Sequence, residues 1–216
     1  MKKLLLSVIA VAVLFISAQA QITFGPKVGL NLANVAGDNT EDAKMKMGLQ
    51  IGFVTDIAFS DAISLQTGLM FSQKGTKADL DIATETYTMK TNVNYLEIPI
   101  NAVYGLNLGS NKLQLFAGPY VGIGLTGKTS LDMDGSDDMD IQFVNDYVDV
   151  DADKTGLKRF DIGLNFGAGY KINNIQIQAN YGLGFSNLIP DFDGEASDDK
   201  VSNRVIQLSV AYFFGN

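Results

Sequence analysis

The sequence contains no cysteine and no histidine. Without cysteine the chain has no disulfide framework, no thiol nucleophile and no thiolate metal site. Without histidine it lacks the usual general base, the Ser-His and Cys-His nucleophile pairs and histidine-based metal centres. The formal net charge of −8 also argues against nucleic acid as a partner. We therefore expect a protein that is not an enzyme and that binds no cofactor.

The first 20 residues predict a signal peptide that is cleaved. Lys2 and Lys3 give it a charged start, residues 4–16 form an apolar run, and Ala18-Gln19-Ala20 fits the small-x-small cleavage pattern. A buried helix or a membrane anchor is the alternative, but the run is shorter than the ~20 apolar residues of a membrane-spanning helix. The expected organisation is a signal peptide at 1–20 followed by one domain over residues 21–216.

The rest of the chain alternates between apolar and polar side chains. Two stretches show the pattern with the apolar sets Ile162, Leu164, Phe166, Ala168 and Tyr170, and Ile175, Ile177, Ala179, Tyr181, Leu183 and Phe185. Successive side chains of a strand point to opposite faces, so each stretch has one apolar and one polar face. A soluble sheet buries its apolar face, whereas a barrel in a bilayer exposes it to lipid. No later apolar run is long enough for a membrane-spanning helix, so only a closed barrel could cross a membrane.

The connections between the expected strands alternate in length. We expect eight strands, near residues 23–32, 47–57, 62–72, 94–106, 111–125, 159–171, 175–186 and 204–214. Short turns fall at Ser60-Asp61, Gly109-Ser110 and Asn173-Asn174, and long acidic connections at 33–46, 73–93, 126–158 and 187–203. This asymmetry is typical of outer-membrane barrels. The sequence predicts an all-β fold, an eight-stranded antiparallel up-and-down transmembrane barrel, with long loops outside the cell and both termini in the periplasm.

Two of the short turns also predict the pairing register. Centring a hairpin on Asn173-Asn174 pairs Tyr170 with Ile177, and centring one on Gly109-Ser110 pairs Leu106 with Leu113. Both choices place apolar side chains opposite each other, whereas a slip by one residue would invert the faces.

Three prolines fall inside the expected strands. Proline cannot donate to a sheet ladder, and a closed barrel has no edge strand to hold it. We expect Pro26 to start a strand and Pro99 and Pro119 to lie at bulges. The alternative is that the fourth and fifth strands are broken at these positions.

Charged side chains with lumen parity form the first candidate site. They are Lys27, Asp56, Glu97, Lys112, Asp161 and Lys171. An eight-stranded barrel is just wide enough to be filled by side chains. We expect ion pairs and hydrogen bonds that plug the barrel, because buried charges need partners. The alternative is a path for protons or solutes.

An acidic cluster in the connection 126–158 forms the second candidate site. Its carboxylates are Asp132, Asp134, Asp137, Asp138 and Asp140. Oxygen-rich clusters suit Ca²⁺, although the spacing does not match an EF-hand loop. The alternative is a solvated loop that binds no ion. No other metal site is expected.

The run Asn94-Tyr95-Leu96-Glu97-Ile98-Pro99-Ile100 carries a family resemblance. Together with Gly29-Leu30-Asn31, residues 68–75 and the Gly-Pro-Tyr of 118–120, it resembles the PorT-like outer-membrane β-barrel family of Bacteroidetes-type bacteria. The resemblance covers residues 21–216 and implies an eight-stranded barrel in the outer membrane. Founding members of that family are associated with protein secretion.

Two functions therefore stand as expectations. The first is a non-enzymatic envelope component that contacts other proteins, in protein secretion as the resemblance implies. The alternative is a surface binding or adhesion barrel whose acidic loops hold divalent cations or a ligand. Expected partners are outer-membrane lipid, envelope or secretion proteins, and the barrel-assembly machinery during insertion. A soluble ligand-carrying barrel in the periplasm is a third reading, but its pocket should be apolar, whereas the inward set here is polar.

Overall fold

The computed structural model describes residues 21–82, 85–133, 137–144, 155–191 and 197–215. The predicted signal peptide, residues 1–20, lies outside the described residues. The described part contains no helix long and apolar enough to cross a membrane.

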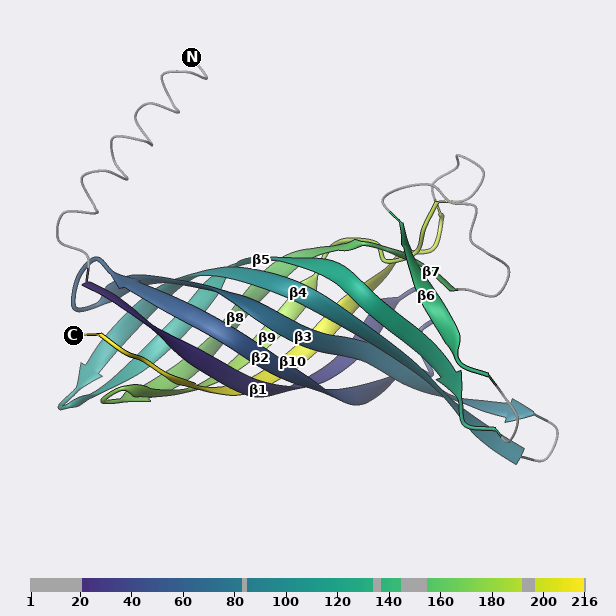
Figure 1. Ribbon diagram of the computed structural model, residues 1–216, viewed down its shortest axis with the longest axis horizontal. Coiled ribbons are helices and arrows are strands. Elements are labelled where there is room, and N and C mark those ends of the chain that lie inside the picture. Colours follow the sequence, from purple (N-terminus) through teal and green to yellow (C-terminus); the bar gives the residue numbers. More distant parts are fainter. Residues whose placement is uncertain (1–20, 83–84, 134–136, 145–154, 192–196, 216) are drawn as a thin grey trace, which may run out of the picture.

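Eight antiparallel strands close into a barrel (Figure 1). The strands of the described part are β1 (Gln21–Gly37), β2 (Lys44–Ala58), β3 (Ile63–Ile82), β4 (Glu85–Leu108), β5 (Asn111–Leu131), β6 (Met139–Val144), β7 (Thr155–Lys158), β8 (Phe160–Ile172), β9 (Ile175–Gly184) and β10 (Val201–Tyr212). The ring runs β4-β3-β2-β1-β10-β9-β8-β5 and closes through pairing of β4 with β5. The predicted eight-stranded antiparallel barrel is confirmed.

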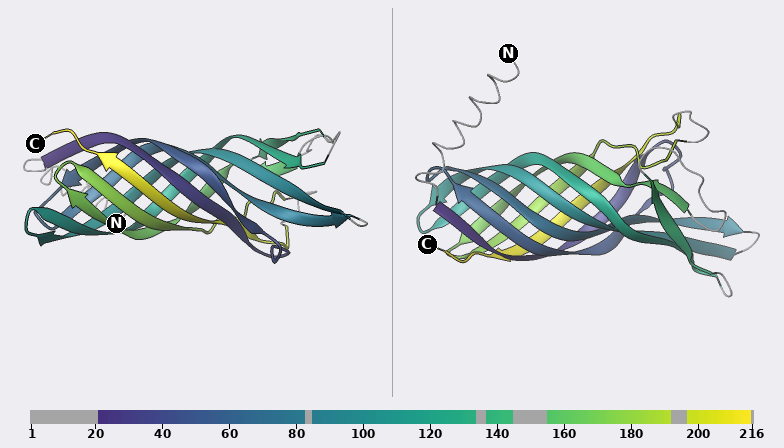
Figure 2. Two further views of the ribbon diagram at one scale, coloured as in Figure 1. Left: turned by 90° about the horizontal axis from the view of Figure 1, so that it is seen from below. Right: turned by 45° about the horizontal axis from the view of Figure 1, so that its top comes forward.

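The two remaining strands lie at the end of the barrel away from the C-terminus (Figures 1 and 2). β5 pairs with β8 only as far as Ile123, opposite Phe160. Farther along, β5 pairs with β6 through Lys128 and Thr129. β6 then pairs in parallel with β7, starting at Ile141. The predicted loop 126–158 therefore contains two short strands and the continuation of β5.

The predicted hairpin registers are confirmed. Tyr170 pairs with Ile177 across the turn Asn173-Asn174, and Leu106 pairs with Leu113 across Gly109-Ser110. Gly109 and Asn173 have φ values of 67° and 51°. These left-handed conformations are the ones that tight hairpins require and that glycine and asparagine tolerate.

The predictions for the prolines were wrong. Pro26 does not start a strand, because β1 begins at Gln21. The β4–β5 register is the same on both sides of Pro99, and the β5–β8 register continues through Pro119, so neither is a bulge or a break. Each of these two prolines instead lies where one neighbouring ladder is interrupted. The β3–β4 ladder skips Ile98 and Pro99, and the β4–β5 ladder skips Gly118 and Pro119, so the missing N–H groups need no shift in register.

The connection predicted over 73–93 is mostly strand. β3 and β4 pair continuously from Gln73 opposite Asn94 to Ile82 opposite Glu85, and the hairpin projects beyond the barrel (Figure 1). The projecting segment is rich in threonine and carries tyrosine and valine, which favour extended structure. Its acidic residues obscured this pattern in the sequence.

Apolar side chains face outward and polar side chains face the lumen. Phe53 is 67% exposed and Ile177 53%, whereas Asn31 and Gln176 are fully buried. A soluble sheet would show the opposite distribution, because burying apolar surface is the main driving force of its folding. The exposed band is what a membrane barrel presents to lipid.

The barrel lumen as candidate functional site

A three-residue charge cluster occupies the centre of the lumen. Nζ of Lys74, on β3, lies 2.6 Å from Oε2 of Glu97 on β4 and 3.0 Å from Oδ2 of Asp161 on β8. All three side chains are buried. One ammonium thus faces two carboxylates, and the cluster carries one net negative charge. Such a cluster is tolerable in a buried site only if further donors surround it.

Asp161 accepts those further hydrogen bonds. Nδ2 of Asn203 donates to Oδ2 of Asp161 at 2.8 Å, and the hydroxyl of Tyr120 donates to Oδ1 at 3.3 Å. The hydroxyl of Ser186 lies 3.4 Å from Oδ1. The ammonium of Lys74 also sits 4.4 Å from the ring centroid of Tyr120, where the ring face attracts a cation. The cluster therefore connects side chains from five strands, β3, β4, β5, β8 and β10.

Side-chain amides fill another part of the lumen. Nζ of Lys27 donates to Oε1 of Gln178 at 2.8 Å, and Nε2 of Gln176 donates to Oε1 of Gln114 at 2.8 Å. Gln66 reaches Gln176 at 3.4 Å. These contacts join strands from across the barrel. They fit the predicted hydrogen-bonded plug better than an open channel.

An apolar cluster, here called the apolar cap, lies next to the charge cluster, since the ring centroid of Tyr95 is 5.3 Å from Nζ of Lys74. Val93 and Tyr95 of β4 form a buried cluster with Ile141 of β6, and Phe143 and Leu157 pack against it. A Cβ at Gly124 would lie 2.3 Å from the ring of Phe143, so a side chain at this position would force the ring to move. The short strands β6 and β7 thus fold their apolar side chains into the outer end of the barrel.

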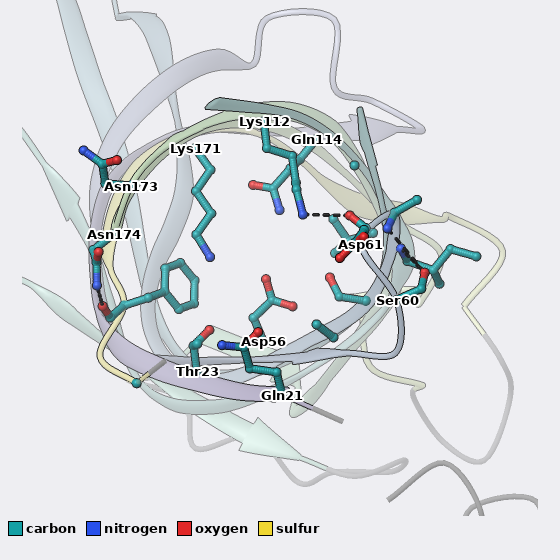
Figure 3. A pocket seen from close by; sticks show the side chains of 18 residues that line it. Gln21, Thr23, Asp56, Ser60, Asp61, Lys112, Gln114, Lys171, Asn173 and Asn174 are labelled. Atoms are coloured by element: carbon teal, nitrogen blue, oxygen red, sulfur yellow. Dashed lines mark hydrogen bonds between the residues drawn. The ribbon is translucent and has the colours of Figure 1, made fainter. Parts of the chain in front are cut away.

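The periplasmic mouth of the lumen is a polar cavity of about 200 Å³ (Figure 3). Asp56, Lys112 and Lys171 line it together with the residues of two hairpin turns. The ammonium of Lys171 lies 4.7 Å from the ring centroid of Phe213, which is buried in the lumen. Nζ of Lys112 donates to the backbone carbonyl of Asp61 at 2.7 Å.

The structure divides the six predicted lumen residues into separate groups. Glu97 and Asp161 belong to the central cluster, Asp56, Lys112 and Lys171 line the mouth, and Lys27 bonds to an amide of the lumen filling. Sequence reasoning missed Lys74, which it assigned to a loop. The signal was present, since Lys74 continues the inward parity of Gln66, Met70 and Ser72 on β3.

Four of the five predicted calcium candidates lie in the described part of the chain, and they form no metal site there. The ammonium groups of Lys90 and Lys128 lie 3.1 Å and 3.5 Å from carboxylates of Asp132 and Asp138. Asp137 and Asp140 are exposed, and Asp134 lies outside the described residues. In the part of the chain that the structure describes, no group of three or more potential ligands could hold a metal ion.

Comparisons with known proteins agree with this architecture. Residues 17–190 match the family model "Outer membrane protein beta-barrel domain". No curated protein matches the chain.

Several solved structures are similar to the chain at low sequence identity. Ail, the attachment invasion locus protein of Yersinia pestis, is 17% identical, with a TM-score of 0.43 over 90% of this chain and 99% of that chain. Neisserial surface protein A is 14% identical, with a TM-score of 0.47 over 88% and 97%. OprG of Pseudomonas aeruginosa is 12% identical, with a TM-score of 0.46 over 91% and 97%.

The match to the family model extends over most of the chain, and the lipid-facing band agrees with it. Long connections lie at one rim and short turns at the other, which in such barrels are the extracellular and periplasmic rims. The chain belongs to the outer-membrane protein β-barrel domain family and resides in the outer membrane.

Proposed function

We propose that this protein is a non-enzymatic surface-binding barrel that uses the projecting ends of β3, β4 and β5 to contact another protein outside the cell. The observation that carries the proposal is the length of β3. Eleven residues, Ser72 to Ile82, follow Phe71, the last apolar side chain of its lipid-facing set. At ~3.3 Å per residue they extend about 35 Å along the strand.

The projecting sheet has one polar and one apolar face. Leu80 pairs with Tyr87, Ala78 pairs with Met89, and Met89 pairs with Leu131, so these side chains share a face. Leu80 is 38% exposed. An apolar face raised into water above a membrane protein is a feature of protein-binding surfaces. We name the set Ala78, Leu80, Tyr87, Met89 and Leu131 the apolar platform.

The opposite face is polar and carries charge pairs. Lys44 pairs with Asp79, and Thr88 donates to Oδ1 of Asp79 at 3.0 Å. Lys90 pairs with Asp132 on the same sheet. Exposed pairs of this kind contribute little to stability. They keep this face hydrated, so the platform is the better candidate for a protein contact.

The identity of the partner separates the two expected functions. Participation in protein secretion rests on the PorT-like resemblance and would place an envelope protein on the platform. Adhesion would place a component from outside the cell there. The filled lumen supports either reading over transport, because among the described residues side chains from non-neighbouring strands bond to one another across the lumen. We also propose that the protein works without a cofactor.

The test is site-specific photocrosslinking in intact cells. A photoreactive amino acid replaces Leu80 on the platform in one strain and Thr88 on the polar face in the matched control. We expect crosslinked protein from position 80 and none from position 88, with mass spectrometry naming the partner. An envelope protein would support the secretion reading, and a partner found only after adding outside material would support adhesion. Equal crosslinking from both faces, or none from either, would contradict the proposal.

A further inference from the structure

We infer that the periplasmic mouth of the lumen is a binding site for a small zwitterion of amino-acid size, with Asp56 holding the ammonium group and Lys112 and Lys171 holding the carboxylate. This site lies at the opposite end of the barrel from the apolar platform. The inference therefore goes beyond the proposed function and does not depend on it.

The first argument is that the charges of the mouth are separated. Asp56, Asp61, Lys112 and Lys171 all line the cavity, so two carboxylates and two side-chain ammonium groups share it. No ion pair joins either carboxylate to either ammonium among the described residues. Opposite charges in a confined site attract strongly, so a plug built for stability alone would bring them together. The lumen centre does so with Lys74, and the mouth does not.

The second argument is the position of the two lysines. Lys112 and Lys171 are direct partners in the β5–β8 ladder, and both side chains reach into the mouth (Figure 3). Like charges directly opposite each other on a sheet are destabilising. Among the described residues, Lys112 donates to a backbone carbonyl, that of Asp61, and Lys171 lies over the ring of Phe213. An anionic group between the two ammonium groups would relieve their repulsion.

The third argument is the carboxylate of Asp56. The residue is buried, with 6% of its surface exposed, and its Oδ1, which is closed off from solvent, has no hydrogen-bond partner among the described residues. Figure 3 shows this carboxylate pointing into the cavity, on the side opposite Lys171 and Lys112. A buried carboxylate oxygen without a donor is costly. An ammonium group in the cavity would give this carboxylate the charged partner that it lacks among the described residues.

Together these groups define the chemistry of the ligand. The two lysines would attract a simple anion, but the carboxylate of Asp56 would repel it. The carboxylate would attract a simple cation, but the lysines would repel it. A molecule that carries both charges a few ångströms apart satisfies both sides. The cavity volume of about 200 Å³ sets the size. A cavity of ~150 Å³ holds one benzene molecule, so this one takes an amino acid and not a long peptide.

The test is titration calorimetry on the full barrel in lipid nanodiscs with three matched probes. L-alanine carries both charges, propionate lacks the ammonium group, and ethylamine lacks the carboxylate. We expect saturable heat with alanine and at least about tenfold weaker binding of the other two, since each lacks one charge-assisted contact. No saturable heat with alanine would overturn the inference. So would equal binding of propionate, which would indicate a general anion site.

Two variants test the assignment of each side. Asp56→Asn should weaken alanine binding about tenfold or more and remove the preference for alanine over propionate. Lys171→Gln should weaken it similarly and remove the preference over ethylamine. Lys128→Gln, an exposed lysine at the other end, is the control and should bind as the unaltered protein does. Variants that keep wild-type preferences would overturn the assignment, and the three-probe comparison on the unaltered protein tests the site even if a variant does not fold.

Discussion

Nζ of Lys74 lies 3.0 Å from Oδ2 of Asp161, although the two residues are 87 positions apart in the sequence. Their strands, β3 and β8, are not neighbours in the ring, so the contact ties one wall of the barrel to another. Glu97 on β4 shares the same ammonium. The centre of the lumen is thus held by a charge cluster, and five predictions concern this cluster and the parts of the structure around it.

Removing Asp161 should destabilise the barrel strongly. Asp161→Ala takes one carboxylate from Lys74 and leaves donors of Tyr120 and Asn203 without their acceptor. Breaking a buried ion pair from one side typically costs about 3–5 kcal/mol. We expect a loss of that size in the free energy of unfolding, measured by urea titration of the barrel refolded into lipid vesicles. The control is Asp132→Ala, whose partner Lys90 is exposed, and it should cost less than about 1 kcal/mol. Equal losses of unfolding free energy in the two variants would show that the buried cluster stabilises the barrel no more than an exposed ion pair does.

Replacing Glu97 by leucine should lower the unfolding temperature. Glu97→Leu removes the acceptor 2.6 Å from Nζ of Lys74 and the acceptor of the Gln207 amide at 3.5 Å. A buried donor left without a partner costs about 1–3 kcal/mol. The shift is measured by the heat-dependent change in mobility on a gel that folded barrels show. An unchanged or raised unfolding temperature would contradict this role for Glu97.

Neutralising the whole cluster should cost less than removing its cation alone. Lys74→Met leaves two buried carboxylates facing each other without a cation. Adding Glu97→Gln and Asp161→Asn to Lys74→Met removes that repulsion, so the triple variant should be more stable than the single one. Urea titration of both variants in the same vesicles measures the difference. If the triple variant is the less stable, the carboxylates have a stabilising role apart from Lys74.

Filling the space at Gly124 should displace the apolar cap. A Cβ at this position would meet the ring of Phe143 at 2.3 Å, so Gly124→Leu forces β6 away from the lumen. We expect faster proteolytic cleavage of the connection 126–158 while the barrel stays folded. Gly122→Ala on the same strand is the control, because its nearest contact is 3.3 Å and needs only a small adjustment. Equal cleavage rates would mean that the cap does not depend on this contact.

The projecting hairpin should respond to pH through Asp79. The hydrogen bond from Lys44, with a second from Thr88, holds the pKa of Asp79 below its ordinary value of 3.8. A depressed pKa in the folded state means that the contact stabilises the hairpin above pH ~4 and loses its effect as pH falls through the depressed pKa. Lys44→Met should raise the pKa of Asp79 toward 3.8, and Thr88→Val should raise it less. Carboxyl-detected NMR titration in nanodiscs measures both, and a pKa unmoved by Lys44→Met would contradict the assignment.

Local patterns in the sequence were enough to predict the barrel. Alternation with period two identified the strands, and the turns Gly109-Ser110 and Asn173-Asn174 set two registers that the structure confirms. Strand ends were harder to place. Beyond Phe71 the outward side chains change from apolar to polar because the strand leaves the lipid, so alternation no longer marks it although its hydrogen bonds continue to Ile82.

The alternation of side chains likewise predicted that Glu97 and Asp161 face the lumen. It could not predict which cation they contact. Lys74 had the right parity, yet its assignment depended on where β3 ends. The cap could not be predicted either, because Ile141 and Phe143 lie in a short segment without a long alternating pattern. Register along each strand follows from neighbouring residues, whereas contacts across the lumen depend on how all eight strands tilt and close.

The sequence by itself determined the fold class, the face of each strand and the side of the membrane on which the turns lie. These properties depend on side-chain alternation and turn chemistry, which act over a few residues. Only the tertiary structure decided that Lys74 joins Glu97 and Asp161, and that side chains of β6 and β7 pack against Val93 and Tyr95. It also decided that Asp56, Lys112 and Lys171 share one cavity without an ion pair among the described residues. Closing a sheet into a ring brings residues from distant strands within a few ångströms of one another, and no local pattern encodes which of them will meet.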